Sequence, residues 1–273
     1  MSAPLLELAH VSKTFGLGGL FSRRRIPAVD DVDFVLRADV PEIFTIVGQS
    51  GSGKTTLARM ILGMETPTSG SIHLLGQNLA HIHGAGSRKL FMGAVQPIFQ
   101  NPFEAFNPLR ELDHYLFLTA RRFGDANDQQ RARTSTDAAM RQVGLSLVEV
   151  AGRYPHELSG GQLQRTAIAR AMLAKPKLIV ADEPVSMVDA SLRMSIVNLF
   201  KTLRDELGIS IIYITHDLAT AYYISDRIMI MKDGRVVESG DARVVLAAPQ
   251  HAYSRQLKDA VLVPHFKVQT SES

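Results

Sequence analysis

Residues 48–55, with the sequence GQSGSGKT, match the phosphate-loop (P-loop) pattern G-x-x-x-x-G-K-[ST] in full. A continuous apolar run, IFTIV at 43–47, precedes the loop, and KTTLARMILG at 54–63 follows it with apolar residues at helical spacing. Glycines let backbone N–H groups converge on phosphate oxygens at the positive end of the following helix. This order of strand, loop and helix predicts a nucleotide site formed by Gly48, Gln49, Ser50, Gly51, Ser52, Gly53, Lys54, Thr55 and Thr56.

Two side chains of this loop have specific predicted roles. The ammonium group of Lys54 is expected to reach the β- and γ-phosphates, where it would also act in catalysis. The hydroxyl of Thr55 is expected to ligate Mg²⁺. Mg²⁺ and a nucleotide are therefore the predicted ligands of the loop.

Polar side chains stand at the ends of three further apolar runs. Asp182 ends KLIVAD and is followed by Glu183, Gln100 closes AVQPIFQ, and His216 follows IIYIT. We predict that Asp182 and Gln100 contact Mg²⁺, that Glu183 polarises the attacking water, and that His216 donates a hydrogen bond to the γ-phosphate. Taken singly, Gln100 is more typical of a turn, and His216 of an ordinary capped strand end.

The order of the predicted elements indicates an α/β fold with a P-loop NTPase core and a mainly parallel sheet. Apolar runs near the N-terminus predict an antiparallel β subdomain, and the segment at about 101–165 predicts an inserted α-helical subdomain. RIMIMKDGRVVESG at 227–240 predicts a hairpin that turns at Asp233 and Gly234. The expected strands are 5–11, 32–36, 43–47, 71–75, 177–182 and 209–217, and the expected core helices are 54–63, 162–174 and 190–207.

Composition excludes several classes of protein. The chain of 273 residues has no cysteine, so disulfides, cysteine-based metal sites and iron–sulfur clusters are excluded. Its net charge of +3 is mild and does not demand nucleic acid, which we do not expect as a partner. No apolar run approaches the roughly 20 residues that span a bilayer, and the N-terminus does not read as a signal peptide. We therefore expect a soluble, cytoplasmic chain that reaches a membrane only through a partner.

A second glycine turn, LSGGQLQR at 158–165, also reads as an anion-binding helix start. The P-loop already encloses most of a triphosphate, so this turn has two predicted arrangements. It lies over the same nucleotide if the helical insertion folds back, or it lies over the nucleotide of a second chain. The second arrangement is a two-fold dimer with two ATP molecules between the subunits.

Read in order, these motifs resemble the nucleotide-binding subunit of an ABC transporter, over about 5–245. The resemblance implies that ATP is the nucleotide and that the second turn acts in trans as the family's signature motif. It is carried by the P-loop, Gln100, LSGGQ, LIVADEP at 178–184, SMVD at 186–189 and ITHD at 214–217, and it assigns the signature role to Ser159, Gly160, Gly161 and Gln162.

The same resemblance implies further roles. Glu183 would be the general base and His216 the switch histidine. Ser186 and Asp189 would couple the two ATP sites, although MVD stands where ALD is commoner. Phe15 would stack on adenine, where the family usually has tyrosine, so the stacking is kept and the hydroxyl is lost.

Three segments resemble the oligopeptide, dipeptide and nickel branch of the family: the P-loop, QNPFEAFNP at 100–108 and APQHAYSRQLKDAV at 248–261. Gln49 stands where that branch commonly has glutamate, and Ala252 where it has proline. The branch implies an ATPase that powers import of peptides or other small solutes at the cytoplasmic face of the inner membrane. Implied partners are two transmembrane permease subunits, a solute-binding protein acting indirectly, and a second ATPase. Without cysteines, the chain resembles the ATPase that pairs with a non-identical one, so a heterodimer is favoured over a homodimer.

Two further expectations concern surfaces and alternatives. Phe103 and Phe106 are expected to form an exposed apolar pair that receives a permease helix, or else to pack in the helical subdomain. The predicted domains are an ATPase domain at 1–245 and a short C-terminal extension at 246–273. One alternative function is a catalytically dead regulatory subunit, which the intact Glu183 and His216 disfavour. The other is an ATPase head of chromosome or translation factors, which the absence of long heptads and the single cassette disfavour.

Overall fold

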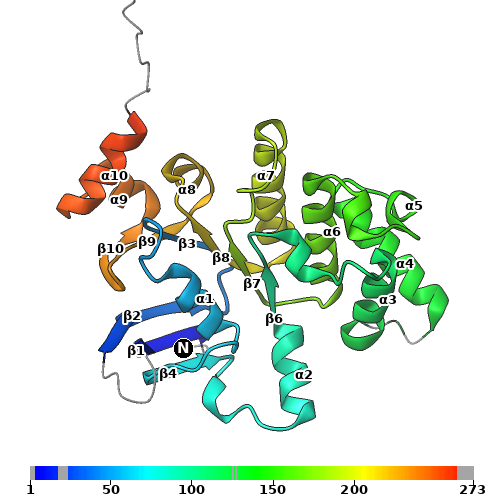
Figure 1. Cartoon of the computed structure of the whole chain (residues 1–273), viewed down its shortest axis with the longest axis horizontal. Coiled ribbons are helices and arrows are strands. Elements are labelled where there is room, and N and C mark those ends of the chain that lie inside the picture. The colour runs from blue at the N-terminus through cyan, green and yellow to red at the C-terminus, as the bar shows by residue number, and fades with distance from the viewer. Residues whose placement is uncertain (1–3, 18–23, 125, 127, 263–273) are drawn as a thin grey trace, which may run out of the picture.

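A computed structural model describes residues 4–17, 24–124, 126 and 128–262 of the chain (Figure 1). Its central sheet has six strands in the order β10-β9-β3-β8-β7-β6. Neighbouring strands are parallel except for the β9–β10 hairpin, which confirms the predicted mainly parallel sheet. The strands are β3 (Ile43–Val47), β6 (Val95–Ile98), β7 (Leu178–Asp182), β8 (Ser210–Thr215), β9 (Arg227–Lys232) and β10 (Arg235–Asp241).

A second sheet is antiparallel and has the order β2-β1-β4-β5. Its strands are β1 (Pro4–Leu17), β2 (Arg24–Arg37), β4 (Ser69–Leu74) and β5 (Gln77–Asn78), so β1 and β2 are longer than the sequence predicted. Helix α1 (Lys54–Ile61) lies between the two sheets (Figure 1). Its buried Leu57 and Met60 share one hydrophobic core with both sheets, and Phe34 stacks on Phe44 at 4.8 Å between ring centroids. This core fixes the start of α1 beside the central sheet.

The inserted helical subdomain forms the right-hand part of the molecule in Figure 1. Helices α3, α4 and α6 pack on one another through apolar residues spaced along one face, such as Leu112 and Leu116 of α3. The predicted subdomain and fold class are therefore confirmed. Its elements are η2 (Pro102–Ala105), α3 (Leu112–Phe123), α4 (Gln129–Gln142), α5 (Leu147–Val150), η3 (Pro155–Glu157) and α6 (Gly160–Leu173).

The remaining helices surround the sheets. The long helix α7 ends at Gly208, whose φ of 63° is the left-handed conformation that suits a helix C-terminus. In the described part of the chain, no helix is long and apolar enough to cross a membrane. The division of the chain at residue 245 remains a prediction, and it falls within α9. These elements are η1 (Leu79–His81), α2 (Ala85–Ala94), α7 (Ala190–Leu207), α8 (Leu218–Ile224), α9 (Ala242–Ala247) and α10 (Ala252–Leu262).

Candidate active site

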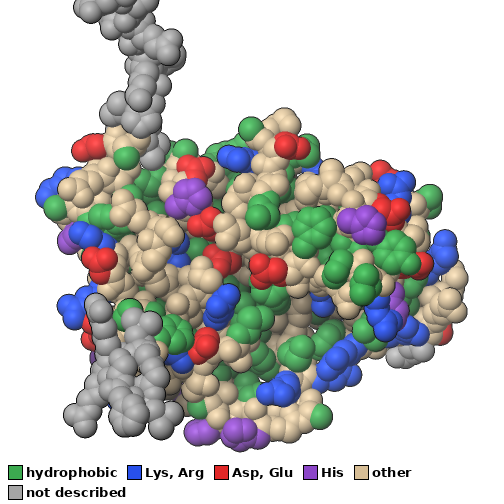
Figure 2. Space-filling view, in the orientation of Figure 1, with side chains coloured by type: hydrophobic (Ala, Val, Ile, Leu, Met, Phe, Trp, Pro, Cys, Tyr) green, Lys and Arg blue, Asp and Glu red, His purple; other side chains and the backbone are tan. Residues whose placement is uncertain are grey.

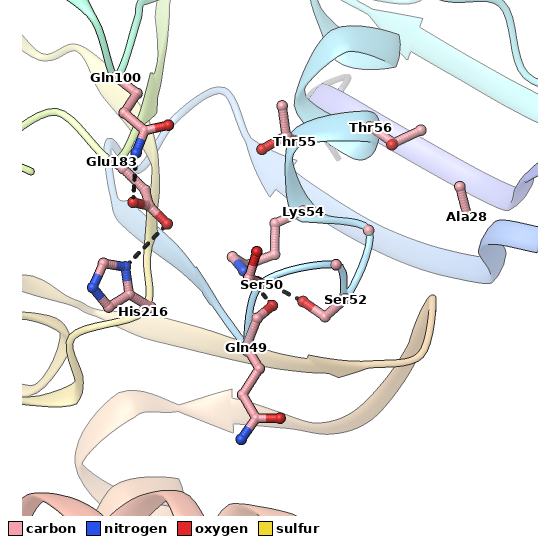
Figure 3. Close-up of a pocket in the computed structure, with 12 residues that line it drawn as sticks. Ala28, Gln49, Ser50, Ser52, Lys54, Thr55, Thr56, Gln100, Glu183 and His216 are labelled. Carbon is pink, nitrogen blue, oxygen red and sulfur yellow. Dashed lines mark hydrogen bonds and ion pairs between the residues drawn. The ribbon is translucent and has the colours of Figure 1, made fainter.

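The P-loop connects β3 to α1 and forms one wall of a pocket of about 630 Å³ (Figure 3). Gly53 has a φ of 99°, and a Cβ there would lie 2.2 Å from the carbonyl oxygen of Ala28. Only glycine fits this position, because the conformation is left-handed and the space is filled. Ala28 of β2 also lines the pocket, and no feature of the sequence indicated it. The lining residues are Ala28, Gln49, Ser50, Gly51, Ser52, Gly53, Lys54, Thr55, Thr56, Gln100, Glu183 and His216.

Lys54 begins α1 and turns its side chain back under the loop. Its Nζ donates to the carbonyl oxygens of Gly48 at 2.7 Å and Gln49 at 2.9 Å, and the residue is only 6% exposed. Burial lowers the pKa of Lys54, while the negative charges of Glu183 and Asp182 oppose the shift. The loop is thus closed around an ammonium group beside the pocket.

Asp182, at the end of β7, and Thr55, in the first turn of α1, come together. The Thr55 hydroxyl hydrogen-bonds to the Asp182 carboxyl group. Burial raises the pKa of Asp182, and the hydrogen bond from Thr55 partly opposes this shift. A hydroxyl and a carboxyl oxygen side by side are the hard ligands that Mg²⁺ prefers. The residues present therefore fit the predicted metal ion.

Glu183 is held between two side chains from neighbouring strand ends (Figure 3). Gln100 Nε2 donates to its Oε2 at 3.1 Å, and His216 Nδ1 lies 3.0 Å from its Oε1. These residues follow β6, β7 and β8, whose carboxyl ends meet at one edge of the sheet. Glu183 also has a φ of 44°, a strained conformation that is common at functional sites. The three residues predicted separately from the sequence therefore form one cluster.

The signature turn begins α6 in the helical subdomain. The Ser159 Oγ accepts from Gln162 N at 3.3 Å, and the Ser159 amide donates to Gln162 Oε1 at 3.1 Å, which forms a capping box. A Cβ on Gly160 would lie 3.1 Å from Met187 O, and one on Gly161 2.9 Å from a Leu192 methyl group. The glycines therefore also let the turn approach the loop before α7 and the first turn of α7. None of the four signature residues is among those that line the P-loop pocket.

Three other predicted site residues do not line this pocket. Ser186 donates from its Oγ to the carbonyl oxygen of Glu183 at 3.0 Å, so the loop before α7 is joined to the cluster. Asp189 precedes the first residue of α7, and its side chain makes no capping bond there. Phe15 lies in β1, 40% exposed, with Lys13 Nζ 5.0 Å from its ring centroid. Neither Phe15 nor Asp189 lines the P-loop pocket.

The expected exposed pair in the 100–108 segment is half wrong. Phe103 is 43% exposed, as predicted, but Phe106 is only 4% exposed. Phe106 packs edge-on against Tyr115 at 5.7 Å, and the Arg170 guanidinium lies 5.6 Å from its ring centroid. Because α3 and α6 supply these two neighbours, Phe106 belongs to the core of the helical subdomain.

Comparison with known proteins agrees with this geometry. The family model described as ABC transporter matches residues 29–186. The oligopeptide transport ATP-binding protein OppF of Haemophilus influenzae is 37% identical over 98% of the chain and 81% of its own length. The dipeptide transport ATP-binding protein DppF of Escherichia coli is 37% identical, over 95% of the chain and 77% of its own length. Among solved structures, the dimeric MJ0796, a bacterial ABC transporter cassette, superposes with a TM-score of 0.76 at 28% identity, over 87% of this chain and 99% of its own.

A P-loop beside the cluster of Gln100, Glu183 and His216, with a helical insertion that bears a second glycine turn, defines an ATP-binding cassette. The chain belongs to the ABC transporter family of ATP-binding subunits. It binds ATP and is an ATPase.

Proposed function

We propose that this chain is the ATP-hydrolysing subunit of an ABC importer for peptides or other small solutes. The observation that carries the proposal is the single pocket that joins the P-loop to the cluster of Gln100, Glu183 and His216. Its support for peptides is the similarity to subunits named for oligopeptide and dipeptide transport. The same similarity over nearly the whole chain favours transport over a chromosome or translation role.

The pocket suggests how hydrolysis proceeds. Lys54 would hold the β- and γ-phosphates, and Glu183 would orient the attacking water as general base. His216 and Gln100 contact the Glu183 carboxylate and so would couple its position to the γ-phosphate. Thr55, Asp182 and Gln100 would hold Mg²⁺, which when bound supplies positive charge against the phosphate oxygens.

We propose that the second glycine turn completes the ATP site of another subunit. The separation of the signature residues from the P-loop pocket supports this arrangement, and so does the likeness to a dimeric cassette. The first-turn amides of α6 would then face the γ-phosphate of the partner. Ser186 and Asp189 would couple the two sites, and Phe15 would stack on adenine. A heterodimer is favoured over a homodimer.

The proposed partners in the membrane are two permease subunits. A solute-binding protein would deliver the solute to them. The permease subunits would hold the chain at the cytoplasmic face of the inner membrane. A groove of about 770 Å³ between α2 and the helical subdomain offers a docking site. Its lining includes the apolar Phe91 and Phe99 and the basic Arg88 and Arg170. Hydrophobic and basic side chains lie together on this face of the molecule (Figure 2). Glu104 and Ala105 also line it, which places the exposed Phe103 beside the groove. A permease helix with an apolar face would fit there.

Replacing Phe103 with serine is expected to reduce solute-stimulated ATPase activity in the assembled transporter severalfold. The removed aromatic surface would otherwise be buried by the permease, and an aromatic anchor is worth more than its neighbours at an interface. ATPase activity of the subunit without permeases should not change. The matched control is Leu109→Ser, because Leu109 directly follows the 100–108 segment and is 83% exposed. Equal stimulation in the two variants would show that Phe103 is not part of the docking surface.

The transport proposal is tested by assembling the chain with two candidate permeases, a second ATPase and a solute-binding protein in vesicles. We expect ATPase activity to rise when the binding protein carries a peptide, and peptide uptake to require ATP. Activity that no permease pair or solute changes would favour a role outside transport.

A further inference from the structure

The C-terminal helix α10 reaches the P-loop through one side chain. Tyr253, in the first turn of α10, is 4% exposed, and its hydroxyl accepts a hydrogen bond from the backbone N–H of Gln49 at 3.0 Å. The two residues are 204 positions apart in the chain. Gln49 is the second residue of the P-loop, so the C-terminal segment contacts the phosphate site itself.

Gln49 is held on both sides of its Cα. Its N–H donates to Tyr253, and its carbonyl oxygen accepts from the Nζ of Lys54 at 2.9 Å and from the amide of Ser52 at 3.2 Å. The Gln49 side chain points away from Glu183 and His216 (Figure 3). The contacts that fix this residue are therefore made by its backbone. The same residue accepts directly from the Lys54 ammonium group, which would bind the phosphates.

Tyr253 is itself fixed in place by its surroundings. Its ring belongs to a small hydrophobic core that includes Val47, just before the P-loop, and Leu218, two residues after His216. Lys232 Nζ lies 5.1 Å from the ring centroid. A buried, packed ring holds its hydroxyl in one position, which a surface tyrosine would not do.

The start of α10 is anchored to the central sheet independently. The Glu238 carboxylate of β10 accepts from the backbone N–H groups of Gln250 at 2.8 Å and His251 at 3.1 Å. Charged acceptors of this kind make stronger hydrogen bonds than neutral ones. The segment before Tyr253 is therefore attached to β10 independently of the tyrosine. Tyr253 in turn connects this anchored segment to the P-loop.

We propose that Tyr253 is a positioning residue for ATP binding, which holds the P-loop backbone at Gln49 in the conformation that receives the phosphates. The inference rests on the proposed assignment of the P-loop pocket as the ATP site. Without the hydroxyl, the Gln49 amide loses its partner and the loop gains freedom that nucleotide binding must then remove. The effect falls on ATP affinity, because Tyr253 does not line the pocket where the γ-phosphate reacts.

The test is Tyr253→Phe in the full chain, which keeps the ring and removes only the hydroxyl. Loss of one neutral hydrogen bond predicts that KM and Kd for ATP rise about three- to tenfold, while kcat at saturating ATP stays within about twofold. Glu238→Ala, which releases the start of α10, should raise KM in the same direction. The matched control is Tyr222→Phe on α8, since Tyr222 is 58% exposed, and its KM should equal that of the native chain.

A purely structural role gives a different result. It would lower the melting temperature and the active fraction, and so kcat, while KM stays at the native value. That outcome, or native KM and kcat in both Tyr253→Phe and Glu238→Ala, would overturn the proposal. Hydrolysis by Lys54→Ala, measured in parallel, separates the role of Tyr253 from the assignment of the P-loop pocket as the ATP site. If that variant hydrolyses ATP normally, the assignment of the ATP site is wrong.

Discussion

Replacing Glu183 with glutamine is expected to slow ATP hydrolysis roughly 10²-fold or more while ATP binding is kept, because the positioned base is removed. Glutamine has nearly the same shape, so it can still accept from Gln100 and contact His216, which lie 3.1 Å and 3.0 Å from the native carboxylate. The phosphate-binding residues of the loop are unchanged. Single-turnover hydrolysis and equilibrium ATP binding measure the two effects separately.

The same substitution should also change the assembly state. If ATP joins two subunits and hydrolysis releases them, a Glu183→Gln chain with its partner accumulates as an ATP-bound dimer on a sizing column. Glu206→Gln, an exposed change at the end of α7, serves as the control and should behave as the native chain. Native turnover in Glu183→Gln would show that another group orients the water.

Replacing Lys54 with alanine has the second largest expected effect. The change removes a charge aimed at the phosphates, and the loss of one such donor costs about 3–4 kcal/mol, or roughly 10²- to 10³-fold in kcat. It also leaves the carbonyl oxygens of Gly48 and Gln49 without the ammonium group that both now contact. ATPase activity and transport should both fail, because the loop loses its ligand contact and its internal support.

The control for Lys54 is Lys177→Ala, an exposed lysine before β7 that lies outside the pocket. It should keep native activity. Transport at the native rate by a complex that contains Lys54→Ala would mean that the partner's ATP site alone is sufficient.

Local sequence patterns predicted most of the site. The P-loop follows from its glycine spacing between an apolar strand and a helix. The sequence also predicted that Asp182, Glu183 and His216 belong to the site. Each stands at or just after the end of a buried apolar run, and such ends meet at one edge of a parallel sheet. The inserted helices follow from the helix-favouring segments at about 101–165, which differ from the short apolar runs near the N-terminus.

Contacts between distant segments could not be predicted. Phe106 looks like its neighbour Phe103 in the sequence, yet α3 and α6 bring Tyr115 and Arg170 onto its ring. The contact of Tyr253 with Gln49 joins residues 204 positions apart, and no periodic pattern in the sequence indicates it. Helix α2 was also missed, because AGSRKLFMGA at 85–94 contains three small residues at its start and only partly buries its apolar residues, such as Phe91 and Ala94.

The position of the second glycine turn is the central claim, and Ser159→Arg tests it. An arginine side chain is too large to let two subunit faces close on one phosphate, and it would compete with the amides of α6. Ser146→Arg, which alters the capping serine of α5, controls for the loss of a helix cap, a cost of about 1 kcal/mol.

The decisive measurement compares ATP binding by the isolated Ser159→Arg chain with hydrolysis in the assembled dimer. We predict native ATP affinity in the isolated chain, together with loss of hydrolysis at the site that holds the partner's P-loop. In a homodimer, mixing Ser159→Arg with Lys54→Ala chains should restore one working site in about half of the dimers, because both lesions then fall on the same composite site. Loss of ATP binding in the isolated Ser159→Arg chain would contradict the account, because both glycine turns would then serve one nucleotide.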